Sequence, residues 1–185
     1  MRPVISWPLF QLVIHRQIMK SILFNAGIFR EEEERYFFAL HKELTSHGID
    51  FKITAAFNLG RDLDFIVPNP VVFGEFFDNF GLASLLTDAE IAEAEKLAHL
   101  WGRREQYDAR CIRRLALGYE TQLRVLQPSL VILWNRYTLP SRVLEFLAKK
   151  FDIPTLTLER TPFPYLLSLD PMGSLCDSKI YQDAL

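Results

Sequence analysis

The sequence has few cysteines and no long run of charge of one sign. Its 185 residues include only Cys111 and Cys176, which lie far apart and have no histidine at a spacing typical of metal ligands. Neither a disulfide framework nor a zinc site is indicated, and a reducing cytoplasm is the simplest location. The 21 Lys and Arg residues face 23 Asp and Glu residues, for a net charge of -2, without a basic block. The charge therefore gives no support for a nucleic-acid partner.

Motifs that bind phosphates, cofactors or metals are also absent. No G-x-G-x-x-G segment follows the first predicted strand and no Gly-Lys-Ser/Thr loop occurs, which disfavours a NAD dehydrogenase or a P-loop NTPase. There is no G-x-S-x-G elbow and no His-Glu-x-x-His pair, and the histidines are scattered: His15, His41, His47 and His99. We expect no cofactor and no metal, and we favour a surface or packing role over catalysis for each histidine.

The apolar stretch near the amino terminus, residues 4–14, is too short for a membrane span. Pro8 and Gln11 interrupt it, no small-residue cleavage site follows, and a span needs about 20 residues. Residues 1–18 have three open interpretations: a packed extension, a weak membrane-surface contact, or a translated segment upstream of a start at Met19. We favour the last, because the sequence after Met19 has the pattern of a domain that opens with a buried strand.

Apolar and aromatic residues dominate what is present: 49% of residues are hydrophobic and 15 are Phe. A chain of this length forms one domain and buries about 70% of the surface it exposes when unfolded. Strands are predicted from apolar runs at residues 21–24, 51–57, 129–134 and 155–159. Helical patterns follow the first and third of these. The alternation predicts an open, mostly parallel Rossmann-like α/β sheet with helices on both faces, over residues 19–175, followed by a tail at 176–185.

The pattern within each element predicts its place in the sheet. Residues 51–57 alternate apolar and other side chains, so this strand is predicted to be half exposed and near the sheet edge. Residues 129–134 are apolar on both faces, as expected for the centre of a parallel sheet. The helix after the first strand has an apolar face formed by Tyr36, Phe37, Leu40 and Leu44. The helix after the third strand is predicted to bury Val143, Leu144, Leu147 and Phe151.

Residues 58–126 form an insertion that departs from this alternation. Its first part, residues 58–86, is irregular but contains phenylalanines that the fold, a partner domain or a ligand must hide: Phe65, Phe73, Phe76, Phe77 and Phe80. Thr87 and Glu90 then form a capping box that opens a helical region ending near residue 126, with a break near Gly102. Within residues 103–124 six arginines outnumber three acids, which is typical of a solvated helix face or of a surface that attracts an anionic lipid-linked acceptor or the membrane: Arg103, Arg104, Arg110, Arg113, Arg114 and Arg124.

Three segments that follow predicted strands are expected along one edge of the sheet. Ligands of open α/β sheets bind beyond the carboxyl ends of the strands, which here are residues 25–27, 135–138 and 159–164. Asn25 and Gly27 are candidate substrate-binding residues on this basis. Asn135 is a third, because its amide could donate to a sugar or phosphate oxygen, although a strand-end asparagine often satisfies backbone groups instead.

The most distinctive segment is residues 159–173, with the sequence ERTPFPYLLSLDPMG. It resembles the E-R-G-x-x-P-x-T-L-x-x-D-x-x-G-V-N segment of the bacterial capsule polysaccharide biosynthesis proteins, a family that includes Kdo transferases. The strand that ends in Trp134-Asn135, the helix after it and Ile153-Pro154 resemble the same family's strand, W-N, helix and G-I-P arrangement.

The resemblance covers residues 128–175 and is general over residues 19–57. It departs from the family at Thr161, where the family has glycine, and at Ser174-Leu175, where the family has V-N. A side chain at position 161 is bulkier than glycine and alters both the turn and the space for a substrate.

The family resemblance implies a two-domain glycosyltransferase, of which this chain is the amino-terminal, acceptor-side half. The implied partners are a nucleotide-sugar donor such as CMP-Kdo, a glycan or glycolipid acceptor, and a missing carboxyl-terminal domain or partner chain. The implied location is the cytoplasm, with a peripheral contact at the inner face of the membrane. On its own, a chain of this kind is expected to be inactive.

The resemblance also directs attention to particular side chains. Glu159 is the candidate catalytic residue, as a general base for an acceptor hydroxyl or as a group that orients the sugar. The structural alternative is a carboxylate paired with Arg160, itself a candidate substrate-binding residue, or with a turn amide. Asp170, Pro171 and Gly173 occupy turn positions, so Asp170 and Gly173 are either structural turn residues or part of a site.

Two other functions compete with this one. The runner-up is a non-catalytic Rossmann-like module that binds a sugar or a partner subunit through its phenylalanine-rich insertion. A flavodoxin-like domain is disfavoured, because residues 25–27 offer neither an acidic pair nor a Ser/Thr-rich phosphate loop.

Overall fold

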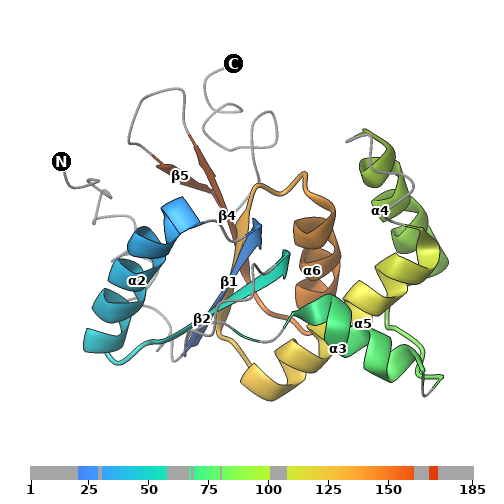
Figure 1. Ribbon diagram of the computed structural model, residues 1–185, viewed down its shortest axis with the longest axis horizontal. Coiled ribbons are helices and arrows are strands. Elements are labelled where there is room, and N and C mark those ends of the chain that lie inside the picture. The colour runs from blue at the N-terminus through green and yellow to red at the C-terminus, as the bar shows by residue number, and fades with distance from the viewer. Residues whose placement is uncertain are drawn as a thin grey trace.

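The structure is a computed structural model that describes residues 21–28, 31–57, 67, 69–79, 81–100, 108–160 and 167–170. Within these residues the chain forms a sheet with the order β2-β1-β3-β4-β5, whose first four strands are parallel (Figure 1). The strands are β1 (Ser21–Ile28), β2 (Asp50–Phe57), β3 (Leu130–Trp134), β4 (Thr155–Arg160) and β5 (Leu167–Asp170). The predicted α/β class with a mostly parallel sheet is confirmed.

Helices cover both faces of the sheet, as predicted. α2 (Glu31–Ser46) lies on one face, whereas α5 (Ala109–Leu126) and α6 (Leu139–Lys150) lie on the other (Figure 1). α3 (Pro70–Asp78) and α4 (Asp88–Leu100) pack against α5 on that second side. The sheet is therefore the middle of three layers.

One core lies between the sheet and α2. Phe37 and Leu44, predicted for the apolar face of α2, are buried, and the ring centroid of Phe37 lies 5.0 Å from that of Phe24. The sheet contributes the side chains that alternate toward this face: Ile22, Phe24, Phe51, Ile53, Leu130, Ile132, Leu156 and Leu158. Each such burial stabilises the fold by about 1.5–3 kcal/mol relative to exposure.

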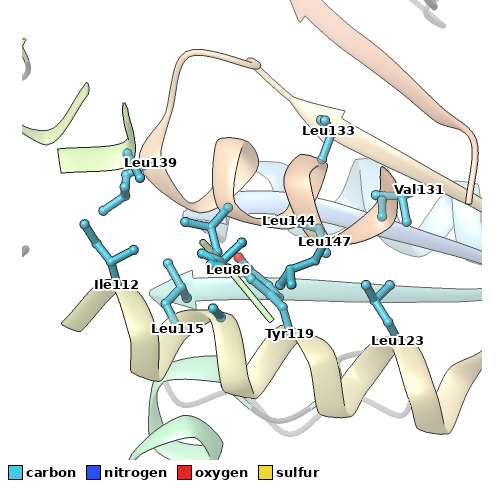
Figure 2. Packing of buried hydrophobic residues seen from close by; sticks show 14 of the residues in the cluster. Leu86, Ile112, Leu115, Tyr119, Leu123, Val131, Leu133, Leu139, Leu144 and Leu147 are labelled. Atoms are coloured by element: carbon cyan, nitrogen blue, oxygen red, sulfur yellow. The ribbon is translucent and has the colours of Figure 1, made fainter. Parts of the chain in front are cut away.

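A second core lies between the sheet and the helices α5 and α6. Figure 2 shows Leu115, Tyr119 and Leu123 of α5 facing the side chains from β3 and α6. The α6 side chains Val143, Leu144 and Leu147 are fully buried as predicted. Phe151, predicted to be buried with them, is only partly buried, because it lies at the end of α6. The guanidinium carbon of Arg124 lies over its ring, 5.1 Å from the ring centroid.

β2 lies at the sheet edge, as predicted, but it is less exposed than its alternation suggested. The Lys52 side chain is 30% exposed, whereas Thr54 is fully buried. The reason is that the chain returns along this edge: the Val67 N–H donates to the Ile53 carbonyl (2.8 Å), and α3 packs against β2.

The first part of the insertion is not wholly irregular, contrary to the prediction, because it contains α3. Asn69 caps this helix by accepting from the Val71 N–H (2.8 Å), and Pro70 occupies the first turn, where a missing N–H costs nothing. The Asn69-Pro70 pair was the signal for this start. Phe76 of α3 is exposed; Phe65 and Phe80, and the side chain of Phe73, lie outside the described part of the chain.

The helical part of the insertion follows the prediction closely. The Thr87 N–H donates to Glu90 Oε2 (2.7 Å) and the Glu90 N–H donates to Thr87 Oγ1 (3.3 Å), which is the expected capping box at the start of α4. α4 ends at Leu100 and α5 begins at Ala109, so two helices flank the predicted break; Gly102 itself is outside the described residues.

β5 was not predicted and extends the sheet beyond β4. It runs antiparallel to β4, with Asp170 opposite Thr157 and Leu167 opposite Arg160. The alternation of Leu167 and Leu169 with Ser168 and Asp170 was its only local signal, and a four-residue run is too short to distinguish a strand from a turn segment.

Candidate functional site

The carboxyl ends of the parallel strands meet at one edge, and the strand order reverses there. β2, the next strand in the chain, pairs with one edge of β1, and β3, which follows later, pairs with the opposite edge of β1. A topological switch point therefore lies between β1 and β3. Ligands of open α/β sheets bind beyond such points. Asn25 of β1 pairs with Leu133 of β3, and the Asn135 N–H donates to the Leu158 carbonyl of β4 (3.1 Å). The ends of β1, β3 and β4 are thus neighbours at this edge.

Buried polar side chains gather at the same edge, on the face that α6 covers. Asn25, Thr54 and Ser141 are fully buried and Thr157 is 5% exposed. Asn25 is opposite Thr54 on β2 and opposite Leu133, which is opposite Thr157 on β4, so three of them form a row across four strands. We call Asn25, Thr54, Ser141 and Thr157 the carboxyl-edge polar cluster.

Ser141 in the first turn of α6 connects this cluster to the sheet. Its Oγ accepts from Asn25 Nδ2 (3.3 Å) and donates to the Trp134 carbonyl at the end of β3 (3.1 Å). The hydroxyl of Thr138, the N-cap of α6, donates to the same Oγ (2.9 Å). One hydroxyl therefore joins β1, β3 and α6, which fixes the position of the β3–α6 turn.

Asn135 occupies a left-handed conformation in this turn, with φ 57°. Its Oδ1 accepts from the Tyr137 N–H (3.0 Å), and its carbonyl accepts from the Thr138 N–H (3.2 Å). Asparagine tolerates this conformation because its side chain can satisfy nearby backbone groups. The side-chain oxygen of Asn135 thus has a structural role, and its side-chain NH2 is the group that could donate to a ligand.

Two arginines near this edge, Arg136 and Arg142, are matched by carboxylates. Arg136 pairs with Glu145 (2.7 Å), and Arg142 pairs with Glu145 (2.8 Å) and with Glu93 of α4. Burial acts to lower the pKa of Arg142, but its hydrogen bonds to Glu93 and Glu145 outweigh burial and raise that pKa. Two cations and two anions leave this part of the edge close to neutral.

The other sequence-predicted site residues are placed only by their backbone. Glu159 and Arg160 end β4, opposite Ser168 and Leu167, but their side chains are outside what the structure describes. Gly27 lies at an irregularity of β1, where the register with β2 shifts after Asn25. The roles assigned to these three residues stay predictions.

The predicted turn at the end of the distinctive segment also stays a prediction. Asp170 is the last residue of β5, a position that a turn can follow, while Gly173 lies outside the described residues.

Sequence reasoning missed three residues of the polar cluster, Thr54, Ser141 and Thr157. Ser141 had a usable signal, since Thr138 and Pro140 mark a helix start and place it in the first turn. Thr54 had no such signal, because a threonine in an alternating strand is ordinarily exposed.

The arginine-rich surface of α5 is largely paired with acids from α3 and α4. Arg110 and Arg114 both contact Asp78 (3.2 and 2.8 Å), and Arg113 contacts Asp88 (3.3 Å). Arg103 and Arg104 lie outside the described residues. Of the two interpretations of these arginines, ordinary ion-paired helix faces account for the three on α5 that contact acids.

The described residues offer neither a metal site nor a membrane-spanning helix. They contain no group of three or more His, Cys, Asp or Glu side chains placed to hold a metal ion. Among the same residues, the helices are too short or too polar to cross a membrane. No family model, curated protein or solved structure matches the chain significantly.

Proposed function

We propose that this chain is the amino-terminal, acceptor-side half of a glycosyltransferase that builds capsule or another surface polysaccharide. The observation that carries the proposal is the position of the segment that resembles the capsule polysaccharide family. Its Glu159-Arg160 pair ends β4 at the carboxyl edge, beside the switch point where α/β sheets bind their ligands.

The described side chains at this edge suit an acceptor sugar. Asn135 retains a side-chain NH2 donor, and Asn25, Thr138 and Ser141 form a hydroxyl and amide network beneath the turn that carries it. Hydroxyl and amide groups of this kind carry no charge and can orient the hydroxyls of a sugar by hydrogen bonds. In the proposed enzyme a second domain or partner chain faces this edge and holds the donor, CMP-Kdo being the first to test, at the inner face of the membrane.

Glu159 is the proposed general base of the complete enzyme. Glu159→Gln keeps the length of the side chain but cannot accept a proton, so sugar transfer should fall about 10²- to 10⁴-fold. The measurement is CMP release from CMP-Kdo with a glycan acceptor, made on the complete transferase. Asp170→Asn makes the same carboxylate-to-amide change at the predicted turn, and it should leave turnover per folded molecule largely intact.

Two results would argue against this role. Near-normal turnover of Glu159→Gln would remove Glu159 from the chemistry, and loss of folding would instead favour its structural pairing with Arg160. The 185-residue chain alone should show no transfer, since orienting donor against acceptor requires both walls of a cleft; robust turnover by this chain would overturn the half-enzyme proposal.

The second candidate is a non-catalytic module that binds a partner through the insertion. The exposed side chains of Phe76, Leu82 and Leu85, 59%, 53% and 44% exposed, favour it. They lie within ten residues of one another in the chain, and exposed apolar surface is typical of protein interaction sites.

A further inference from the structure

One buried hydroxyl at the carboxyl edge is not used by the fold. Thr54 is fully buried, and its Oγ1 has no hydrogen-bond partner among the described residues. Buried polar groups are nearly always hydrogen-bonded, and an unsatisfied one costs about 1–3 kcal/mol. Valine would have the same shape without that cost. The threonine therefore indicates a role that valine could not fulfil.

Thr54 lies at a break in the sheet, beside the site already described. It is the in-register neighbour of Asn25, and paired residues of parallel strands present their side chains on the same face. The β1–β2 register shifts directly after this pair, between Asn25 and Gly27 and again between Gly27 and Ile28. Bulges of this kind often lie next to binding sites, where they interrupt pairing and redirect side chains.

Among the described side chains, those next to Thr54 in the carboxyl-edge polar cluster are polar but uncharged. The Asn25 amide donates to Ser141 Oγ, Ser141 Oγ donates to the Trp134 carbonyl, and Arg136 and Arg142 are paired with Glu93 and Glu145. The first turn of α6 is also poor at binding anions: Pro140 has no N–H, and the Ser141 N–H donates to Thr138 Oγ1 (3.4 Å). A phosphate would lose its water here without gaining a countercharge.

We propose that Thr54, Asn25 and Ser141 form the floor of a site for a neutral, hydroxyl-rich ligand, a sugar or another polyol. A sugar hydroxyl both donates and accepts, so it can satisfy the Thr54 hydroxyl and contact the neighbouring Asn25 amide at the same time. This inference builds on the proposed function and specifies that the edge holds the hydroxyls of the acceptor rather than the phosphates of the donor.

The hydrogen-bond network that includes Asn25 and Ser141 reaches the surface at the β3–α6 turn. Asn135 and Thr138 are partly exposed, and Thr138 contacts Ser141, so the network extends from the surface to the buried floor. Because Thr54 and Asn25 are fully buried, the edge must open for the ligand to enter. That opening lowers the apparent affinity for a single sugar.

The test combines binding and stability measurements on Thr54→Val in the full 185-residue chain. Glucose, galactose, N-acetylglucosamine and glycerol are each titrated by NMR, with the side-chain amide of Asn25 as the reporter. The variant should be as stable as the parent or more so, because a buried unsatisfied hydroxyl is removed. It should bind the best of these polyols about two- to tenfold more weakly, which is the contribution of one neutral hydrogen bond. The exposed Thr45→Val on α2 is the matched control and should not change binding.

Several outcomes would overturn the proposal. They are the absence of any polyol response at Asn25, equal binding by the variant and the parent, and stronger binding of inorganic phosphate than of every polyol. A marked loss of stability in Thr54→Val would also overturn it, since the hydroxyl would then be satisfied within the fold. Polyol binding by this chain without transfer by the complete enzyme would refute the proposed function alone, and transfer without polyol binding at Thr54 would refute this site alone.

Discussion

At the scale of single residues, Glu120 is the described carboxylate whose environment is least usual. It lies on α5 and is buried, and its Oε1 accepts from the Leu85 N–H (2.6 Å) in the segment between α3 and α4. Burial raises the pKa of Glu120, although the hydrogen bond from Leu85 and the charges of Arg124 and Lys150 act in the opposite direction. The folded state therefore takes up a proton at Glu120 more readily than the unfolded state does.

This raised pKa predicts a pH-dependent gain from Glu120→Gln. The stability that Glu120 contributes is fully present below its ordinary pKa and is lost as the pH rises through its raised folded pKa. Glutamine stays neutral and keeps an oxygen for the Leu85 N–H, so its stability advantage over the parent should grow as the pH rises above the ordinary glutamate pKa and level off above the raised folded pKa. Urea unfolding at several pH values measures this difference.

The reference for this prediction is the parent protein, unfolded in urea at the same pH values. An advantage of Glu120→Gln that shrinks as the pH rises would show that pairing with Arg124 and Lys150 outweighs burial.

At the scale of elements, the crossing of α3 and α5 depends on two glycines. A methyl group on Gly74 would collide with the Arg114 carbonyl of α5, and one on Gly118 would collide with the Pro70 carbonyl of α3. The contact is therefore backbone against backbone. Arg114 then pairs with Asp78 (2.8 Å), and this hydrogen bond is the largest cause of the lowered pKa of Asp78.

Gly118→Ala should destabilise the protein although it improves helix propensity. In an open helix the change is expected to stabilise by about 0.5–1 kcal/mol. Here the added methyl must push α3 away from α5, and overpacking of this kind costs about 1–3 kcal/mol. Denaturant unfolding measures the change in the free energy of unfolding.

Gly48→Ala is the control, because it tests a glycine that has open space around it. No atom lies within 4 Å of its added methyl, but its φ of 73° makes alanine unfavourable, by about 1–2 kcal/mol. The two losses of stability have different causes, and double variants with Gly74→Ala separate them. The stability lost on Gly74→Ala should be partly redundant with that of Gly118→Ala, because both substitutions push α3 and α5 apart. It should add fully to that of Gly48→Ala. Stabilisation by Gly118→Ala would show that the helices are further apart than described.

At the scale of the whole molecule, the described apolar surface is unevenly distributed. The parallel sheet is covered on both faces. Of the exposed large apolar side chains among the described residues, Phe76, Leu82 and Leu85 lie between the start of α3 and the start of α4, while Phe38 on α2 and Val125 on α5 lie elsewhere. The ring of Phe76 packs edge-on against that of Phe77 at 5.4 Å between centroids. The sequence predicted that the phenylalanines of the insertion must be buried by the fold, a partner domain or a ligand. Of those whose side chains the structure describes, Phe77 is partly buried and Phe76 is exposed.

Phe76→Ser should therefore reduce the binding of a hydrophobic dye, or self-association, without a large loss of stability. Surface substitutions away from special features usually change stability by about 0.5 kcal/mol or less. Val125→Ser, at a 75% exposed position on α5, is the control and should leave dye binding unchanged. Dye fluorescence and sedimentation measure the two effects, and equal responses of both variants would argue against a specific apolar surface.

The sequence by itself determined the class of the fold and most of its elements, α3 and β5 excepted. The first and third strands, the amphipathic faces of α2 and α6, and the capping box at Thr87 and Glu90 all follow from local patterns. These patterns act over a few residues, so periodicity and capping chemistry are enough to find them. The order of strands and helices then restricts the chain to an α/β sheet, whose carboxyl edge is the expected place for a site.

The tertiary structure alone decided which side chains meet at that edge. Asn25 and Ser141 are 116 positions apart and Thr54 lies on a third element, so no local pattern could join them. The same holds for the contact of Gly74 with α5 and for the pairing of β5 with β4. Thr54 shows the physical reason most directly, because a threonine in an alternating strand becomes a buried hydroxyl only once α3 and the returning chain at Val67 cover β2.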